Sequence, residues 1–317
     1  MSWRILKFLK EGATVSGEEI SAGLGISRAA VWKKITLLRK KGYVIQAVPS
    51  RGYLLVASPD LAVEQIITQI QGNLWKTVLY YPSVDSTNDL AASMRDILPG
   101  TVIIADSQTR GRGRLGRSWI SPPGRNIYLS MIIRPELLPR DAPLLTVLTA
   151  VSCAHALRCL SGLPLSIKWP NDLTAQGKKI GGILTETRSD PDHIQQAVIG
   201  VGVNVNMSMD DIPDDLRETA TSLVLETGRY FQRTALIVGM LSEFERQYKI
   251  LLGEGKESLL ADLRALSSTI GRDVVVTAGN ERLAGHAEEI DDDGVLILRL
   301  ASGERRRVSA GDLHMTR

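Results

Sequence analysis

The sequence predicts a multidomain α+β protein with a basic helical N-terminal module, a central mixed α/β domain and a small C-terminal domain of strands. Three observations predict this organisation. The 317 residues exceed a typical single domain of about 100–150 residues. Apolar residues recur at helical spacing near the N-terminus, and further along the chain their spacing is in turn that of strands and of helices. The last part of the chain has the pattern of short strands divided by turns. Charge is uneven, because the first 57 residues hold ten basic and three acidic side chains although the whole chain carries only +3.

Composition excludes several classes of protein. With 44% hydrophobic and 23% charged residues, the chain resembles folded proteins rather than disordered or collagen-like ones. Its two cysteines, Cys153 and Cys159, would lie about 120° apart on a helix, which argues against an internal disulfide and fits a reducing compartment. Charges interrupt the apolar N-terminus, and we expect no apolar run of the roughly 18 residues that a membrane span needs. The sequence therefore predicts a cytoplasmic protein without a membrane partner.

The first 57 residues have the pattern of a winged helix-turn-helix. Apolar residues between Trp3 and Leu9 form one helical face, and Ser16 with Glu19 forms a capping box that begins the next helix. After a turn, Ser27 caps a third helix that continues to residue 40. Residues 43–48 and 53–55 alternate like strands on either side of the turn 49–52. A β-hairpin, the wing, therefore follows the helix that ends at residue 40, which is the second helix of the helix-turn-helix motif.

This module is a candidate DNA-binding domain. In such a module, the helix from residue 27 to residue 40 lies in the major groove and nearby cations contact phosphates. Winged helices also dock proteins, and scattered lysines are often a solvated surface, but the excess of positive charge favours DNA. One module reads one half-site, so specific binding implies a dimer. The candidate contacts are the basic residues of this helix and of the hairpin tip: Arg28, Lys33, Lys34 and Arg51.

Ser58-Pro59-Asp60 interrupts both the strand pattern and the helical pattern, which indicates a domain boundary there. A helix is expected over 61–73. We place the domains at 1–57, 65–266 and 268–317. In the central domain, strands are expected at 78–81, 102–105, 127–133, 166–169, 180–185 and 197–205, and a long helix at 142–160, giving a mixed sheet with helices on one side.

Two further helices, at 234–252 and 257–266, precede the C-terminal strands at 273–278, 282–289, 294–300 and 305–308. Turn residues divide these strands, which favours an SH3-like β-barrel. Asp291-Asp292-Asp293 is interpreted as a solvated turn, and the four histidines are too scattered for zinc. No protein-held metal is expected.

Residues 111–116 match the dinucleotide fingerprint G-x-G-x-x-G letter for letter. The fingerprint requires a helix after it, and Pro122-Pro123-Gly124 excludes one, so we reject the match. The segment also lacks the lysine of a P-loop. Guanidinium groups suit carboxylate and phosphate oxygens, so an anion-binding loop is favoured over a plain surface loop. Four arginines lie within eight residues: Arg110, Arg112, Arg114 and Arg117.

Four segments follow the winged helix in a fixed order. They are Asp85-Ser86-Thr87-Asn88, residues 111–119, residues 168–172 and residues 178–186, supported by residues 199–206. In this order and spacing, the segments and the winged helix resemble the biotin protein ligase family in the bifunctional form that also represses the biotin operon. The resemblance covers nearly the whole chain, and the lipoate ligases share the fold. Leu115 departs from relatives that carry a further arginine there.

The resemblance implies a biotin-[biotin carboxyl-carrier protein] ligase that works in two steps. The biotin carboxylate attacks the α-phosphate of ATP, with Mg²⁺, to give biotinyl-5′-AMP and pyrophosphate, and a lysine of the biotin carboxyl carrier of acetyl-CoA carboxylase then takes the biotinyl group. It also implies that the adenylate-bound form dimerises and binds operator DNA, so that biotinyl-AMP is the corepressor. The residues fit independently, because joining two anions requires positive charge and positioning rather than an enzyme nucleophile.

The resemblance also implies site residues. Lys179, Arg114 and Asp172 are the catalytic candidates, Asp172 as the group that orients or deprotonates the acceptor lysine. Three alternatives stay open: Lys178 points inward instead, Trp119 is a core residue, or Asp172 caps a turn. Biotin would contact Ser86, Thr87, Asn88, Gln108, Arg112, Gly113, Arg114, Lys179 and Gly182. ATP would contact Arg114, Arg117, Trp119, Asn171, Lys179 and Asn204.

A mixed anhydride hydrolyses readily, so residues 111–117 are expected to close over the ligands and exclude water. Three hypotheses follow. The chain is a ligase that is also a repressor, a lipoate-type or ligase-only enzyme whose N-terminus docks proteins, or a ligand-sensing repressor without catalysis.

Overall fold

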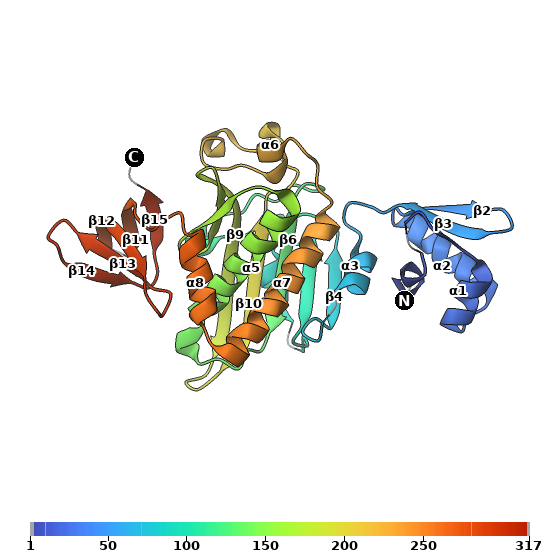
Figure 1. The fold of residues 1–317 in the computed structure, drawn as a ribbon, viewed down its shortest axis with the longest axis horizontal. Coiled ribbons are helices and arrows are strands. Elements are labelled where there is room, and N and C mark those ends of the chain that lie inside the picture. Colours follow the sequence, from blue (N-terminus) through green and yellow to red (C-terminus); the bar gives the residue numbers. More distant parts are fainter. Residues whose placement is uncertain (1–2, 10, 71, 95, 280, 316–317) are drawn as a thin grey trace. The chain divides into compact units, whose positions relative to one another are not determined.

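The computed structural model describes residues 3–9, 11–70, 72–94, 96–279 and 281–315. It divides the chain into two compact units (Figure 1). The first unit consists of Met1–Gln71 and Gln232–Val238, and the second of Gly72–Phe231 and Gly239–Arg317.

The first unit contains the helix-turn-helix and its wing, as predicted. Ser16 and Ser27 begin the two helices, because their hydroxyls accept hydrogen bonds from the amides of Glu19 (3.0 Å) and Ala30 (3.2 Å). Val31, Ile35 and Leu38 recur on one helical face and are buried in the core. Its elements are η1 (Trp3–Lys7), β1 (Thr14–Val15), α1 (Gly17–Leu24), α2 (Arg28–Lys40), β2 (Val44–Val48), β3 (Gly52–Ala57) and α3 (Val63–Gln69), with sheet order β1-β3-β2.

The second unit is built on a seven-stranded mixed sheet in the order β4-β5-β6-β10-β9-β8-β7. β4 and β5 are parallel and the other neighbours are antiparallel. Figure 1 shows α5, α7 and α8 lying along one face of this sheet. The strands are β4 (Thr77–Tyr81), β5 (Thr101–Ala105), β6 (Ile127–Ile133), β7 (Leu165–Lys168), β8 (Asp172–Ala175), β9 (Lys178–Ser189) and β10 (Ile194–Val203). The helices and turns are α4 (Thr87–Ser93), η3 (Pro139–Asp141), α5 (Pro143–Ser161), η4 (Met209–Asp211), η5 (Asp214–Leu216), α6 (Leu223–Thr227), α7 (Arg233–Glu254) and α8 (Glu257–Leu266). The first residues of α7, up to Val238, belong to the first unit.

The central strands and α5 form the core of this unit. Every residue of β5 and β6 is buried, which explains why both strands are continuous apolar runs rather than alternating ones. The expectation that no apolar run is long enough for a membrane span was wrong. Pro139–Ser161 passes that test by length and composition, yet 72% of its window is buried inside the fold, as in a core helix.

The C-terminal strands form an antiparallel sheet in the order β14-β13-β12-β11-β15. In the part of the chain that the structure describes, this order is open, so a closed SH3-like barrel is not confirmed. Asp291 makes the predicted turn, because its Oδ1 accepts hydrogen bonds from the amides of Asp293 (2.9 Å) and Val295 (3.0 Å). The strands are β11 (Asp273–Ala278), β12 (Glu281–Ile290), β13 (Leu296–Leu300), β14 (Arg305–Val308) and β15 (Asp312–Met315).

Candidate active site

The arginine-rich segment between β5 and β6 is a loop. Instead of a helix after residue 116, the structure has one 3-10 turn, η2 (Arg114–Gly116), and a bridge between Arg112 and Ser118. Leu115 has a φ of 55°, a left-handed conformation that strains a residue with a side chain, and this side chain is 72% exposed. Such strain is common where a loop contacts ligand. The loop geometry agrees with rejecting the dinucleotide fingerprint.

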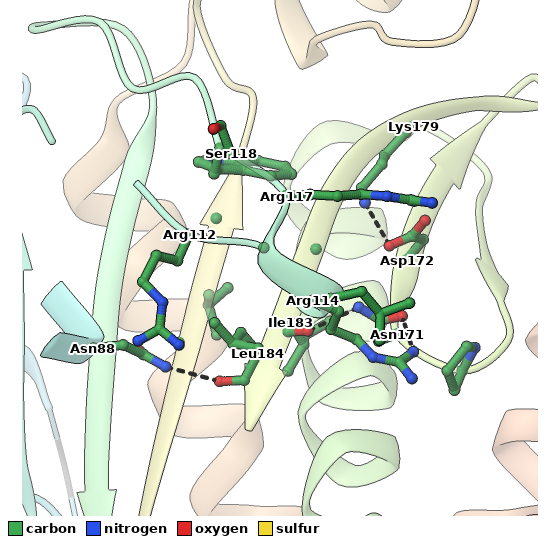
Figure 2. Close-up of a pocket in the computed structure, with 18 of the residues that line it drawn as sticks. Asn88, Arg112, Arg114, Arg117, Ser118, Asn171, Asp172, Lys179, Ile183 and Leu184 are labelled. Carbon is green, nitrogen blue, oxygen red and sulfur yellow. Dashed lines mark hydrogen bonds and ion pairs between the residues drawn. The ribbon is translucent and has the colours of Figure 1, made fainter. Parts of the chain in front are cut away.

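This loop lies over a cavity with about 890 Å³ of empty space, part of it open to solvent. Figure 2 shows arginines of the loop facing Asn88, Asn171, Asp172 and Lys179 from other elements. Thirteen of the fourteen predicted catalytic, biotin-binding and ATP-binding residues line the cavity: Ser86, Thr87, Asn88, Gln108, Arg112, Gly113, Arg114, Arg117, Trp119, Asn171, Asp172, Lys179 and Gly182.

Asn204 is the residue that does not line it. Its side chain is buried, with Nδ2 donating to the carbonyl of Thr221 (2.9 Å) and Oδ1 accepting from Asn126 (3.4 Å). The amide of Thr221 in turn donates to the carbonyl of Lys179 (2.9 Å). Asn204 therefore supports the backbone of Lys179 from behind, and its contact with nucleotide stays a prediction.

One end of the cavity is formed by the first turn of α4. Ser86 caps this helix, since its hydroxyl accepts a hydrogen bond from the amide of Asp89 (3.3 Å). The amide and hydroxyl of Thr87 donate to Oε1 of Gln108, at 2.8 and 3.2 Å. These hydrogen bonds hold three of the residues predicted to bind biotin, Ser86, Thr87 and Gln108, in one orientation.

Asn88 is 3% exposed, and its side-chain amide is used within the protein. Its Oδ1 accepts from Ser130 (2.6 Å), and its Nδ2 donates to Glu186 (2.8 Å) and to the carbonyl of Leu184 (3.2 Å; Figure 2). Gly200 packs directly on it, because a Cβ there would lie 2.3 Å from Oδ1. Asn88 therefore shapes the floor of the cavity by joining α4 to β6 and β9.

Lys179 provides positive charge at the other end. Its Nζ lies 2.6 Å from Oδ1 of Asp172 (Figure 2). The same Nζ lies 5.5 Å from the centroid of the Trp119 ring. Neighbouring residues of a strand point to opposite faces. Lys178 accordingly donates to the carbonyl of Arg217 (3.2 Å) and does not line the cavity. Of the two adjacent lysines, Lys179 is the one at the site.

The arginines of the loop are anchored by separate partners. Arg114 donates to Oδ1 of Asn171 (2.8 Å), and burial lowers the pKa of its guanidinium. Arg117 forms two hydrogen bonds with Asp312 of β15, one of 3.0 Å, which raise the pKa of Arg117. The C-terminal sheet therefore contributes directly to the cavity.

Arg112 sits at the α4 end of the cavity between two carboxylates. It pairs with Asp89 and, at 2.7 Å, with Glu186. The hydrogen bonds that Arg112 donates to Asp89 first, and then to Glu186, raise the pKa of its guanidinium. Since Glu186 also accepts from Asn88, these contacts tie the loop to α4 and β9.

Trp119 forms a flat wall of the cavity and is only partly buried, so it is not a core residue. It lies against Gly202, where an added Cβ would be 2.6 Å from the indole, and against Gly182, where the separation would be 3.3 Å. Its Nε1 is buried and has no hydrogen-bond partner among the described residues. A ligand with an acceptor atom would satisfy this group.

Sequence reasoning missed several lining residues. Lys168 lines the cavity, but the sequence analysis gives it no role. It lies in the segment 168–172 of the resemblance, and a cation in that segment was a signal that could have indicated a binding residue. Asp312 carried no signal, because it is one acidic residue in a C-terminal strand that was not predicted. Ser118, Trp169 and Gly200 also line the cavity.

In the first unit, the predicted DNA contacts lie on α2 and at the turn between β2 and β3. Arg28, Lys33 and Arg51 are exposed and Lys34 is half-buried. None of the four forms an ion pair with another described residue, so their charge is available to a polyanion. Trp32, which sequence reasoning missed, is 55% exposed on the same helix.

Comparison with known families gives three matches along the chain. Residues 4–54 match an HTH domain, residues 80–204 match the Biotin/lipoate A/B protein ligase family, and residues 269–313 match the Biotin protein ligase C terminal domain.

Similar proteins span nearly the same length. The bifunctional ligase/repressor BirA of Bacillus spizizenii is 37% identical over 93% of this chain and 92% of its own. BirA of Escherichia coli is 34% identical over 93% of this chain and 91% of its own. The solved biotin protein ligase from Aquifex aeolicus, in complex with biotin and ATP, superposes with a TM-score of 0.68 at 26% identity, over 77% of this chain and 100% of that one.

Proposed function

The chain belongs to the biotin protein ligase family in its bifunctional ligase/repressor form, and from this premise we propose how its cavity works. It is an ATP-dependent ligase that forms biotinyl-5′-AMP from biotin and ATP and transfers biotin to a lysine of a biotin carboxyl carrier protein. It is also a transcriptional repressor that binds operator DNA. The observation that carries the proposal is the charge of the cavity, which holds five cations and two carboxylates.

The charge supports adenylation because both reactants are anions. A carboxylate oxygen of biotin attacks the α-phosphorus of ATP, and the bond from that phosphorus to the bridging oxygen breaks. Negative charge builds up between the reactants, where positioned cations stabilise it most effectively. Lys179 and Arg114 project into the cavity from β9 and from the loop, and we assign them to the α-phosphate and the biotin carboxylate.

The remaining ligand contacts follow from position in the cavity. The α4 end would hold the ureido group of biotin through Ser86, Thr87 and Gln108, with Asn88 setting the floor and Arg112 above it. Gly113 and Gly182 allow the ligand to approach the backbone closely. Trp119, Asn171 and Arg117 would hold the nucleotide, with Asn204 supporting the backbone of Lys179.

Asp172 is the candidate group for the second step. The acceptor lysine must lose its proton before it attacks the carbonyl carbon of the adenylate. Asp172 is paired with Lys179, so it becomes available as a proton acceptor when Lys179 binds phosphate oxygens. This pairing supports a catalytic role over a turn cap.

Mg²⁺ would accompany ATP. The structure shows no group of three or more His, Cys, Asp or Glu suited to a metal within the residues it describes. Asp172 and Asp312 are already paired with cations. These residues therefore fit a metal held mainly by the phosphates, where Mg²⁺ would neutralise charge.

For the repressor, we propose that biotinyl-AMP is the corepressor and that the adenylate-bound chain dimerises on the operator. Free cations on α2 and at the wing support DNA as the partner. The adenylate must then bind the dimer-competent state more tightly than the monomeric state.

Two free cysteines support a cytoplasmic location. We also propose an SH3-like fold for the C-terminal domain, because such a fold would use five antiparallel strands, the number found in this sheet.

Mixing the purified chain with biotin, labelled ATP and a carrier domain tests the proposal. We expect pyrophosphate release that depends on biotin, labelled carrier, and a mobility shift of operator DNA that increases with biotin and ATP. Labelled carrier without a DNA shift would support a ligase whose N-terminus docks proteins. A DNA shift without pyrophosphate would support a sensor without catalysis.

A further inference from the structure

Lys168 lines the cavity but has no role in the proposed chemistry so far. It is the last residue of β7, the edge strand of the sheet, and lies opposite Asp172 of β8 in the strand register. Its side chain is half-buried. A lysine that ends an edge strand and lines a cavity is placed where it can contact a ligand.

The charged groups around Lys168 leave it without a counter-ion. The charged groups that act on its amine are Asp172, Lys179, Asp312 and Arg117, all of which line the same cavity. Both carboxylates are engaged, Asp172 with Lys179 at 2.6 Å and Asp312 with Arg117. The side chain of Lys168 forms no ion pair or hydrogen bond with the other residues that the structure describes.

Holding this cation in place is unfavourable for the folded protein. Burial lowers the pKa of the Lys168 amine, and the charges of Lys179 and Arg117 add to this effect against the two carboxylates. A group kept under these conditions in a cavity is typical of a functional site, because a stabilising residue would have a partner. A polyanionic ligand would supply the missing negative charge.

We propose that Lys168 binds the pyrophosphate that leaves in the adenylation step. This inference rests on the proposed function. As the carboxylate–phosphorus bond forms, the bond from the α-phosphorus to the bridging oxygen breaks, and its electron pair stays on pyrophosphate. Arg112 is held at the α4 end by Asp89 and Glu186, and Arg117 is held by Asp312. Lys179 and Arg114 are assigned to the α-phosphate and the biotin carboxylate. Lys168 is then the cation available for the leaving group.

Biotin-dependent exchange of labelled pyrophosphate into ATP tests this with the whole chain. Lys168→Met keeps the length and apolar stem of the side chain and removes its charge. We expect the adenylation rate to fall on the order of 100-fold. The KM of pyrophosphate in the exchange should rise about tenfold, the effect of one lost charge-assisted hydrogen bond. Transfer from supplied biotinyl-5′-AMP to a carrier domain should stay within about twofold of wild type, because pyrophosphate has left by then.

Lys178→Met is the matched control, because it removes the same charge ten residues away from a side chain outside the cavity. It should leave the KM of pyrophosphate unchanged. The melting temperature separates function from structure, since Lys168→Met should match or exceed wild type. A lysine that merely stabilises the fold would lower it.

Two results would overturn the proposal. One is a pyrophosphate KM within twofold of wild type in Lys168→Met, and the other is an equal loss of adenylation and of transfer from supplied adenylate. If wild type shows no biotin-dependent exchange, the proposed function itself fails and the inference falls with it. Should Lys168→Met not fold, amine labelling of wild type decides: pyrophosphate should protect Lys168 and not Lys178, and equal labelling would contradict the proposal.

Discussion

Replacing Lys179 with alanine separates chemistry from stability at the centre of the cavity. The Nζ of Lys179 lies 2.6 Å from Asp172, but 37% of the lysine side chain is exposed, so the pair contributes roughly 0–1 kcal/mol to folding. If Lys179 contacts the oxygens that gain charge in the transition state, its loss costs about 2.7–4 kcal/mol there, or about 10²–10³ in rate. Adenylation should therefore suffer far more than folding.

The assay is biotin-dependent pyrophosphate release, measured beside thermal unfolding. We expect Lys179→Ala to slow adenylation by about 10²–10³ while lowering the melting temperature by no more than about 4 °C. Lys178→Ala is the control and should resemble wild type in both measurements. Adenylation within tenfold of wild type, at an unchanged melting temperature, would remove Lys179 from the mechanism.

Three other predictions concern the nucleotide wall, the wing and the cysteines. Gly202→Ala places a Cβ 2.6 Å from the Trp119 ring, so it should raise the KM of ATP about tenfold or more. An unchanged KM would contradict the role of Trp119 as a wall of the nucleotide site. The control is Gly253→Ala in α7, where a Cβ meets no atom within 4 Å beyond its chain neighbours and its own helix backbone; it should keep the KM and stabilise the chain by about 0.5–1 kcal/mol. Replacing Arg28 and Arg51 with alanine together should reduce the slope of log K against log salt for DNA by about two, measured by titrations at several salt concentrations, and an unchanged slope would place the DNA elsewhere. Burial raises the pKa of Cys153 to about 12, so at pH 8 its thiol is protonated and unreactive; iodoacetamide should label the exposed Cys159, and equal labelling of both would refute the burial.

Elements with strong periodicity could be predicted from the sequence. The strand at 127–133 and the helix at 257–266 have the predicted boundaries, because their apolar residues are buried along the whole element. Several short elements were not predicted, among them α4, β8 and β15. α4 depends on the Ser86 cap, β8 has four residues held between β7 and β9, and β15 pairs with β11, about forty residues earlier. β8 and β15 form through tertiary pairing that local pattern does not encode.

The site was predicted mainly through the resemblance of its motifs, and Lys179 shows the limit of that approach. Two adjacent lysines were equivalent in sequence, and the alternation of side chains along β9 distinguished them. Asp312 could not have been found, because its role depends on β15 reaching Arg117 from 195 residues away. The lack of a counter-ion at Lys168 likewise depends on which carboxylates pair with which cations in three dimensions.

The central claim is that one cation-lined cavity forms the adenylate and keeps it from water until an acceptor arrives. The direct test is a single-turnover chase. The chain is incubated with biotin and labelled ATP, passed through a desalting column and then mixed with a carrier domain. Close to one equivalent of biotinyl-5′-AMP should stay bound to the chain and then transfer to the carrier lysine. Adenylate that appears free in solution, or is hydrolysed before the carrier is added, would contradict the claim.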